Sequence, residues 1–254
     1  MIVALAVLAV GLPTPKTETF TVDGVKRQAL VFAPTNASRK PPLVFGFHGH
    51  GGTMNSSVNL FKVQQAWPDA VVVYPQGLPT SGPNDPQGLR SGWQRAPREQ
   101  NDRDLKLFDA IVTKMTQQYS VDPKRIYSVG FSNGTGFTYL LWHTRRAQLA
   151  AAAMVAGIVE NTIKPLKAMP AFIVAGKLDK TAPYDQQLDA IAYVKTVNGV
   201  PPIPSLVKVQ QPTGVQRLRG KLADLGVMIH DGGHEVPTTA IAPIVQFFKH
   251  HPQP

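Results

Sequence analysis

Residues 125–134 read RIYSVGFSNG and are the most informative part of the chain. The segment Arg125–Gly130 is largely apolar, which is typical of a strand buried on both faces. The segment Asn133–Arg146 that follows has the periodicity of a helix. Between them lies a Gly-x-Ser-x-Gly pattern, which places Ser132 on a sharp strand-to-helix turn. This order predicts a nucleophilic serine at the end of a buried strand.

The two glycines of the pattern have a physical reason. Gly130 and Gly134 flank the turn, where a side chain would collide with tightly folded backbone. The following helix directs its positive end at the oxyanion that forms when a serine attacks a carbonyl group. The backbone N–H of Asn133 is therefore an expected donor to that oxyanion. An ordinary glycine-rich turn is the alternative interpretation, and the flanking strand and helix disfavour it.

Outward from the turn, strand-like runs alternate with helical segments. The predicted strands are Leu43–Phe47, Ala70–Tyr74, Arg125–Gly130, Ala150–Ala156, Pro170–Ala175 and Val227–His230. The predicted helices are Asp102–Gln118, Asn133–Arg146, Asp185–Val197 and Thr238–His250. Before them, Asp23-Gly24 joins Thr17–Val22 and Val25–Ala33 as a hairpin. We therefore predict an α/β fold with a mostly parallel sheet, an antiparallel N-terminal hairpin and helices on both faces.

Two long stretches interrupt this alternation. Leu78–Gln100 and Asn198–Gly220 are rich in proline, glycine or polar residues. Loops of this length inside a compact domain are usually functional or mobile, and the first is expected to overhang a pocket. The sequence shows no internal repeat and no interdomain linker. Residues 12–254 are therefore interpreted as a single catalytic domain.

A serine hydroxyl needs a general base to activate it and a carboxylate to orient that base. In folds with this serine turn the chain order is serine, acid, histidine, so the base is expected near the C-terminus. His234 lies in a glycine-rich loop after the strand Val227–His230, and such loops display catalytic side chains. His230 lies inside the strand and is interpreted as a core histidine. His234 is the predicted base.

Asp179 is the predicted acid, because it closely follows the strand that ends at Ala175. Asp185 and Asp189 are interpreted as capping and surface residues of the next helix. Asp231 is close to His234 in sequence and stays an open alternative. Three residues in a tight loop seldom give a stable orienting contact, so Asp179 is favoured.

The second oxyanion donor is expected in the glycine-rich loop His48–Thr53, through the backbone N–H of His50. Zinc binding by His48-x-His50 is an alternative, but no carboxylate or third histidine nearby has ligand spacing, so no metal site is predicted.

Trp93 is a candidate substrate-binding residue, since its ring could stack on a planar or sugar-like group. A tryptophan that only pins its loop is the alternative. Asp102 and Asp104 are interpreted as acids at a helix start.

Composition narrows the function classes. The 254 residues include no cysteine, which excludes disulfides, thiolate metal sites and cysteine nucleophiles from this chain. The net charge of +10 favours anionic partners, but no arginine-rich arm or nucleic-acid module is present, so a solvated basic surface is preferred.

The apolar run Met1–Gly11 is too short to span a bilayer and resembles the remnant of a signal peptide. A buried first strand is the alternative, and export to the periplasm or medium is favoured.

A set of motifs gives a family resemblance. In chain order they are His48-Gly49-His50-Gly51-Gly52, Tyr74-Pro75-Gln76-Gly77, Ser91-Gly92-Trp93, Val121–Tyr127, Gly130–Gly134, Asp179 and Gly232-Gly233-His234. Together they resemble the polyhydroxybutyrate-depolymerase-like esterases, which are similar to bacterial feruloyl and acetylxylan esterases. The resemblance implies a secreted α/β-hydrolase with a triad of Ser132, Asp179 and His234. The sequence departs from many relatives at Asn198-Gly199-Val200, where they carry a cysteine, and at Glu235–Pro237, where they often have Trp-Pro.

These features predict a monomeric serine esterase without cofactor or metal. Its expected substrates are feruloyl or acetyl esters of polysaccharide, or short aliphatic polyester, and no nucleic-acid partner or integral membrane span is expected. Two other functions stay open. One is a serine peptidase of related fold, and the other is a binding protein that has kept the scaffold but lost the chemistry.

Overall fold

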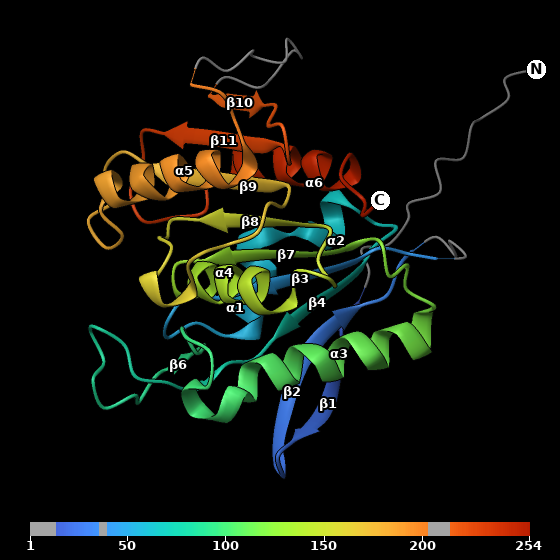
Figure 1. The fold of residues 1–254 in the computed structure, drawn as a ribbon. Helices are drawn as coiled ribbons and strands as arrows, with labels where there is room; N and C mark the ends of the chain where they lie inside the picture. Colours follow the sequence, from blue (N-terminus) through green and yellow to red (C-terminus); the bar gives the residue numbers. More distant parts are fainter. Residues whose placement is uncertain (1–13, 36–39, 203–213) are drawn as a thin grey trace, which may run out of the picture.

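The computed structural model describes residues 14–35, 40–202 and 214–254. The segment Met1–Gly11 lies outside the described residues, as does part of the stretch Asn198–Gly220. The described part is a twisted sheet with helices packed on both sides (Figure 1). Within the three described ranges, no helix is both long enough and apolar enough to cross a membrane.

In the described part of the chain, nine strands form one sheet in the order β1-β2-β4-β3-β7-β8-β9-β11-β10. The strands are β1 (Lys16–Val22), β2 (Val25–Phe32), β3 (Leu43–Phe47), β4 (Val71–Pro75), β7 (Ile126–Phe131), β8 (Ala151–Val155), β9 (Ala171–Gly176), β10 (Val215–Leu218) and β11 (Leu225–His230). The six central strands, from β4 to β11, are parallel. Strands β1, β2 and β10 pair antiparallel at the two edges. The predicted mostly parallel sheet with an antiparallel N-terminal hairpin is confirmed.

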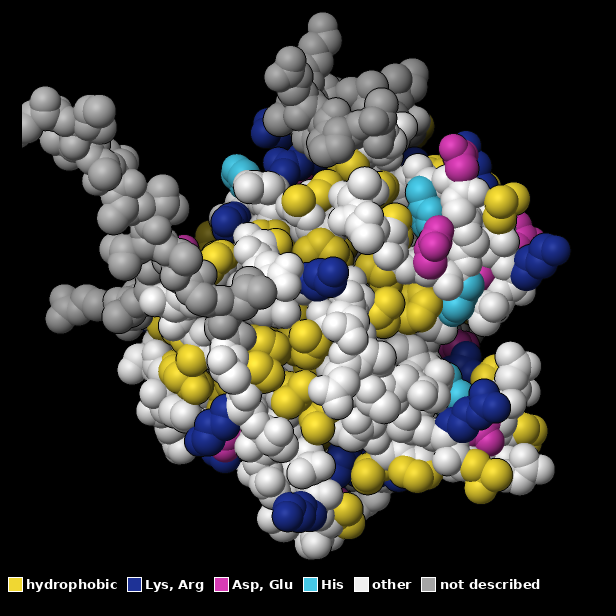
Figure 2. Space-filling view, turned by 180° about the vertical axis from the view of Figure 1, so that it is seen from behind, with side chains coloured by type: hydrophobic (Ala, Val, Ile, Leu, Met, Phe, Trp, Pro, Cys, Tyr) yellow, Lys and Arg dark blue, Asp and Glu magenta, His cyan; other side chains and the backbone are white. Residues whose placement is uncertain are grey.

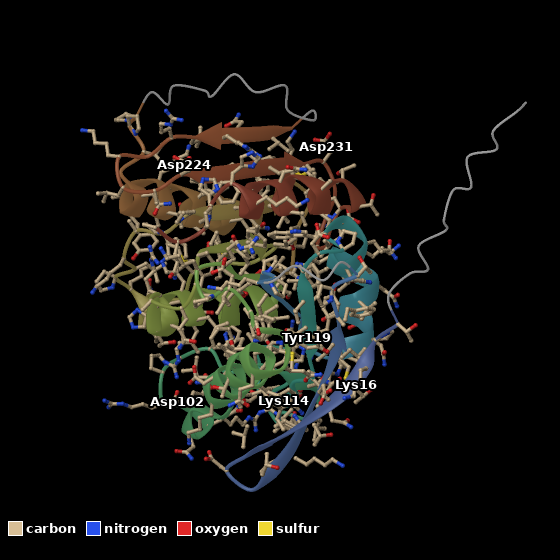
Figure 3. The ribbon with its side chains drawn as sticks, turned by 90° about the vertical axis from the view of Figure 1, so that its right-hand side faces the viewer. Lys16, Asp102, Lys114, Tyr119, Asp224 and Asp231 are labelled. Atoms are coloured by element: carbon tan, nitrogen blue, oxygen red, sulfur yellow. The ribbon has the colours of Figure 1, made fainter. Side chains whose placement is uncertain are left out.

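Six α-helices cover the sheet in the described residues. They are α1 (Met54–Phe61), α2 (Val63–Ala66), α3 (Arg103–Tyr119), α4 (Asn133–Arg145), α5 (Tyr184–Asn198) and α6 (Ile241–Lys249). Two apolar cores result, because each central strand buries side chains on both faces. Helices α3, α4 and α5 contribute to one core, whereas α1, α2 and α6 contribute to the other. Figure 3 shows these two groups of helices on opposite sides of the sheet.

Among the nine strands of the main sheet and the six α-helices, three elements were not expected from the sequence, namely α1, α2 and β10. Helix α1 has a weak apolar pattern, but Thr53 caps it by accepting the N–H of Ser56, and the Ser56 hydroxyl accepts the N–H of Thr53. This reciprocal cap is the signal that could have shown the helix. Strand β10 has only four residues and forms an edge, where hydrophobic alternation is weakest.

The N-terminal hairpin is attached to α3 by ion pairs. Glu18 on β1 pairs with Lys16 and with Lys114 of α3, both labelled in Figure 3. Arg27 on β2 pairs with Asp104 in the first turn of α3 at 2.7 Å, and both side chains are buried. Asp104 therefore has the structural role predicted for it. Besides lying at the positive end of the helix, its carboxylate pairs with the buried guanidinium of Arg27. Removing one partner of such a pair would leave an uncompensated buried charge.

Candidate active site

The turn between β7 and α4 holds Ser132 in a strained conformation, with φ 55° and ψ −118°. The two glycines beside it have no room for a side chain. A Cβ on Gly130 would overlap the carbonyl oxygen of Gly134 and lie 2.6 Å from the Thr138 hydroxyl. A Cβ on Gly134 would overlap the carbonyl oxygen of Phe47 and lie 2.7 Å from that of His48. Close packing of Gly130 on the start of α4, and of Gly134 on the end of β3, thus explains the Gly-x-Ser-x-Gly pattern.

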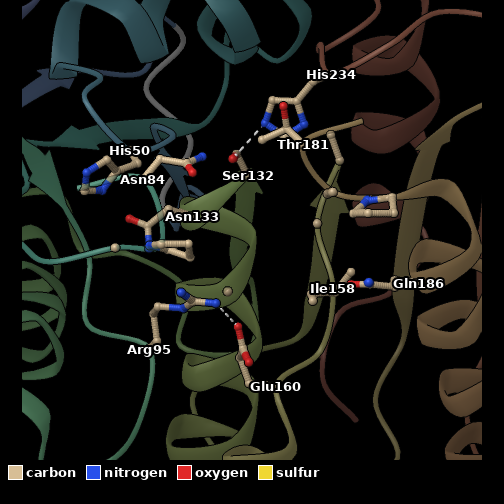
Figure 4. A pocket seen from close by; sticks show the side chains of 17 residues that line it. His50, Asn84, Arg95, Ser132, Asn133, Ile158, Glu160, Thr181, Gln186 and His234 are labelled. Carbon is tan, nitrogen blue, oxygen red and sulfur yellow. Dashed lines mark hydrogen bonds and ion pairs between the residues drawn. The ribbon is translucent and has the colours of Figure 1, made fainter. Parts of the chain in front are cut away.

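Ser132, His234 and Asp179 are joined in one chain of hydrogen bonds. The Ser132 hydroxyl lies 2.8 Å from His234 Nε2, and His234 Nδ1 lies 2.8 Å from Asp179 Oδ2 (Figure 4 shows the first contact). A carboxylate can only accept, so Nδ1–H donates to Asp179 and Nε2 accepts from the Ser132 hydroxyl. The geometry suits removal of the serine proton by the imidazole.

The Asp179 carboxylate is held by several donors besides His234. It is buried in the turn after β9, where its Oδ1 accepts the N–H groups of Thr181 and Ala182 at 2.9 Å each. Its Oδ2 also accepts from Gln187 Nε2 at 3.1 Å. These donors fix the carboxylate, which in turn fixes the orientation of the His234 ring.

The competing acid and base candidates lie elsewhere. Asp231 is exposed and pairs with Lys177 at 2.7 Å, so its carboxylate is directed to solvent rather than to His234. His230 accepts the N–H of Gly232 through Nδ1 and so braces the loop that carries His234. The structure therefore brings together Ser132, Asp179 and His234, and it gives the two alternatives other partners.

His50 and Asn133, the two predicted oxyanion donors, lie at the pocket with Ser132. Asn133 is the first residue of α4, so its N–H has no acceptor within the helix. Among the described residues, the N–H of His50 has no protein acceptor. Both residues line the same pocket as Ser132, where Figure 4 shows them on one side of the serine. The binding of an oxyanion by these two N–H groups stays a prediction.

His48 is a buried structural residue of the glycine-rich loop His48–Thr53, which is called the oxyanion loop below because it carries the predicted donor His50. Its Nδ1 lies 2.8 Å from the Gly49 carbonyl oxygen and its Nε2 accepts the N–H of Gly77 at 3.0 Å. Both ring nitrogens are thus engaged by backbone, which leaves neither for zinc. In the described ranges no group of three or more His, Asp or Glu side chains could hold a metal ion. Burial lowers the pKa of His48 to about 4, so the ring is neutral at pH 7.

We expect this pKa to make stability depend on pH. Between about pH 6.5 and pH 4 the unfolded chain binds a proton at His48 that the folded protein does not bind. Acidification through this window should therefore lower the free energy of unfolding, by about 3 kcal/mol from this residue. The measurement is urea unfolding at pH 7, 5.5 and 4 for wild type and His48→Gln, which keeps an acceptor but does not titrate. Parallel pH curves for the two proteins would contradict the prediction.

The prediction that Trp93 binds substrate is wrong, because its side chain is fully buried with 0% exposure. The ring packs between Phe47 and Phe137, and its Nε1–H donates to the His48 carbonyl at 2.9 Å. The Trp93 N–H donates to Asn133 Oδ1 at 2.7 Å. Trp93 thus connects the two segments that carry the oxyanion donors, and its role is to position them.

The segment Leu78–Gln100 forms a wall of the site. Its short strands β5 (Leu78–Pro79) and β6 (Ser91–Gly92) pair antiparallel, and a turn at Gly82–Asp85 lies between them. Asp85 Oδ2 lies 3.0 Å from His50 Nε2, which attaches this turn to the oxyanion loop. The N–H groups of Leu89 and Arg90 also donate to the Asp85 carboxylate. The pKa of Asp85 is lowered from its ordinary value, and the hydrogen bond from the Arg90 N–H is the largest cause.

A pocket of about 410 Å3 opens beside Ser132. Figure 2 shows a notch in the outline of the molecule with histidine side chains on both sides of it. Besides Ser132 and His234, the pocket is lined by Asn84 and Arg95 from the Leu78–Gln100 segment and by Glu160 after β8. The sequence analysis did not single out these three residues. Glu160 could have been suspected from its place after the carboxyl end of a parallel strand.

The chain is similar in sequence to proteins named as esterases. A bifunctional acetylxylan esterase/xylanase of Neocallimastix patriciarum is 29% identical over 171 residues, which is 65% of this chain and 23% of that protein. A probable feruloyl esterase C of Aspergillus flavus is 29% identical over 138 residues, 52% of this chain and 46% of that protein. The chain thus spans less than half the length of these two relatives. The predicted resemblance to feruloyl and acetylxylan esterases is confirmed.

A comparison with solved structures shows the fold. The solved structure of acetyl xylan esterase from Aspergillus awamori superposes with a TM-score of 0.71 at 16% identity, covering 92% of this chain and 99% of that one. This likeness confirms the predicted α/β-hydrolase fold. The model of the Dienelactone hydrolase family matches residues 28–201. Because that match covers more than half of the sequence, the chain belongs to the Dienelactone hydrolase family.

Proposed function

We propose that the protein is a serine ester hydrolase that acts through an acyl-enzyme. The observation that carries this proposal is the unbroken contact from Asp179 through His234 to Ser132 at the edge of a pocket. Ser132 attacks the ester carbonyl while His234 Nε2 accepts the hydroxyl proton, and the N–H groups of His50 and Asn133 bind the oxyanion.

The second half of the cycle uses the same groups. His234 gives its proton to the leaving alkoxide, which departs as an alcohol and leaves the acyl group on Ser132. A water molecule then attacks the acyl-enzyme, with His234 again accepting a proton, and the acid is released. Asp179 holds the imidazole throughout and stabilises it while it is charged. The strained turn keeps the Ser132 hydroxyl at the pocket without further movement of the backbone.

The proposed substrates are feruloyl or acetyl esters of polysaccharide, with short aliphatic polyester as the alternative. The pocket supports the feruloyl members of the first class, because its volume suits a group larger than acetyl and polar side chains line part of it. The names of the relatives favour the same class.

A small substrate panel tests the proposal. We expect the purified protein to cleave p-nitrophenyl acetate and methyl ferulate, and to cleave the methyl ester of ferulic acid at least about 10³-fold faster than the methylamide. The intact triad supplies the nucleophile for both substrates, but the amine of the amide is a poorer leaving group than the alcohol of the ester. The pocket carboxylate of Glu160 is paired with Arg95. Acetylated xylan and a polyester emulsion complete the panel. Cleavage of the amide at a similar rate would favour the peptidase alternative, and no cleavage of any ester would leave only the binding protein.

A further inference from the structure

The pocket has a charged end that the proposed chemistry does not use. Arg95 lies in the segment between β6 and α3, and Glu160 lies in the segment after β8. Their side chains form an ion pair from Arg95 Nη2 to Glu160 Oε1, although the residues are far apart in sequence. Figure 4 shows the pair at the end of the pocket away from Ser132, beyond Asn133.

The ion pair leaves polar atoms of both partners available. Across the described residues, Arg95 Nε and Nη1 and Glu160 Oε2 have no protein partner. The Arg95 and Glu160 side chains are 34% and 27% exposed, so both are half-buried. A molecule in the pocket therefore meets spare N–H donors beside a spare carboxylate oxygen. Hydrogen bonds to charged groups are stronger than those between neutral groups.

We propose that Arg95 and Glu160 form a subsite for a neutral, hydroxyl-bearing part of the ester. A hydroxyl both donates and accepts, so it can bind the spare carboxylate oxygen and a spare guanidinium N–H together. The pair has no net charge, and an anionic or cationic group would lie beside the partner of its own sign. This inference rests on the proposed esterase function and specifies which substrates that function prefers.

The hydroxyl that binds this subsite could belong to either part of the ester, the acyl group or the alcohol. A phenolic acyl group such as ferulate carries a hydroxyl on its ring, and a sugar carries several on the alcohol part. Simple acetyl and alkyl groups offer none. The subsite therefore predicts a preference between substrates that differ in a hydroxyl, and the experiment has one arm for the acyl part and one for the alcohol part.

The acyl arm compares methyl 4-hydroxycinnamate with methyl cinnamate, and the alcohol arm compares a methyl xyloside monoacetate with cyclohexyl acetate. We expect wild type to prefer the hydroxylated ester in one arm, by about 10- to 100-fold in kcat/KM. In the double variant Arg95→Gln/Glu160→Gln, that preference should fall to less than about 3-fold. Rates on methyl cinnamate and p-nitrophenyl acetate should fall less than the rate on the preferred hydroxylated ester, because neither ester carries a free hydroxyl.

A matched control separates recognition from folding. Arg145 of α4 pairs with Asp109 of α3 outside the pocket, with side chains 25% and 39% exposed, so Arg145→Gln breaks an ion pair of similar exposure. It should leave the hydroxyl preference unchanged. Absence of a preference in both wild-type arms, or equal losses on all substrates in the double variant, would overturn the subsite while the esterase function stands. Failure of wild type to cleave p-nitrophenyl acetate would instead overturn the esterase proposal itself.

Discussion

Replacing Ser132 with alanine is expected to lower kcat/KM on p-nitrophenyl acetate by about 10⁴- to 10⁶-fold. The Ser132 hydroxyl is the group of the triad that would form the acyl bond, and within the described residues no other hydroxyl is hydrogen-bonded to His234. Folding should be unaffected, because alanine is smaller than serine and the backbone keeps its conformation. The measurement is steady-state hydrolysis of the ester, with the melting temperature followed by circular dichroism.

Labelling by a fluorophosphonate provides an independent measurement. The reagent should bind covalently to wild type and not to Ser132→Ala, since it reports the activated hydroxyl directly. Ser120→Ala is the matched control, because Ser120 also has a positive φ, of 54°, but ends α3 outside the pocket lining. The control should keep full activity and full labelling. Equal activity of Ser132→Ala and wild type would exclude Ser132 as the nucleophile.

The positions of the triad residues were predictable because the fold restricts where they can lie. Ser132, Asp179 and His234 each follow a buried parallel strand, and the carboxyl ends of such strands meet at one edge of the sheet. Glycines around Ser132 provided a second signal, since close backbone contacts leave no room for side chains there. Before His234, Gly232 meets the side chains of Glu235 and His230, whereas Gly233 has room for a Cβ. Strand patterns and glycine positions therefore located these residues without knowledge of their contacts.

The remaining parts of the site depend on contacts between distant segments. The sequence placed Trp93 in the correct loop but could not show which way its ring points. In the structure the ring packs against Phe47 and Phe137 in the core. Arg95 and Glu160 meet only because the loops after β6 and β8 are brought together. No local pattern reports such an encounter. Loop side chains are thus the part of this site that sequence periodicity could not supply.

The second large effect is expected from Gly134→Ala. The added Cβ would overlap the Phe47 carbonyl oxygen and lie 2.7 Å from the His48 carbonyl oxygen, and both are backbone atoms that cannot turn away. Either α4 or the end of β3 must shift, at a cost of about 3 kcal/mol or more in the free energy of unfolding. For a domain of this size the melting temperature should fall by about 6–12 °C.

Gly136→Ala is the matched control, since Gly136 lies in the same helix and no atom lies within 4 Å of its added Cβ. Alanine should stabilise that position by up to about 1 kcal/mol, because it favours the helix more than glycine does. Gly136 lines the pocket, so the two variants are compared by their unfolding in urea and not by turnover.

If Gly134→Ala still folds, its activity should also fall by about 10²-fold, because the shift separates the N–H of Asn133 from that of His50. Equal stability of the two variants would mean that the helix start is not packed against β3 as the structure shows, and the explanation of the glycine pattern would fail with it.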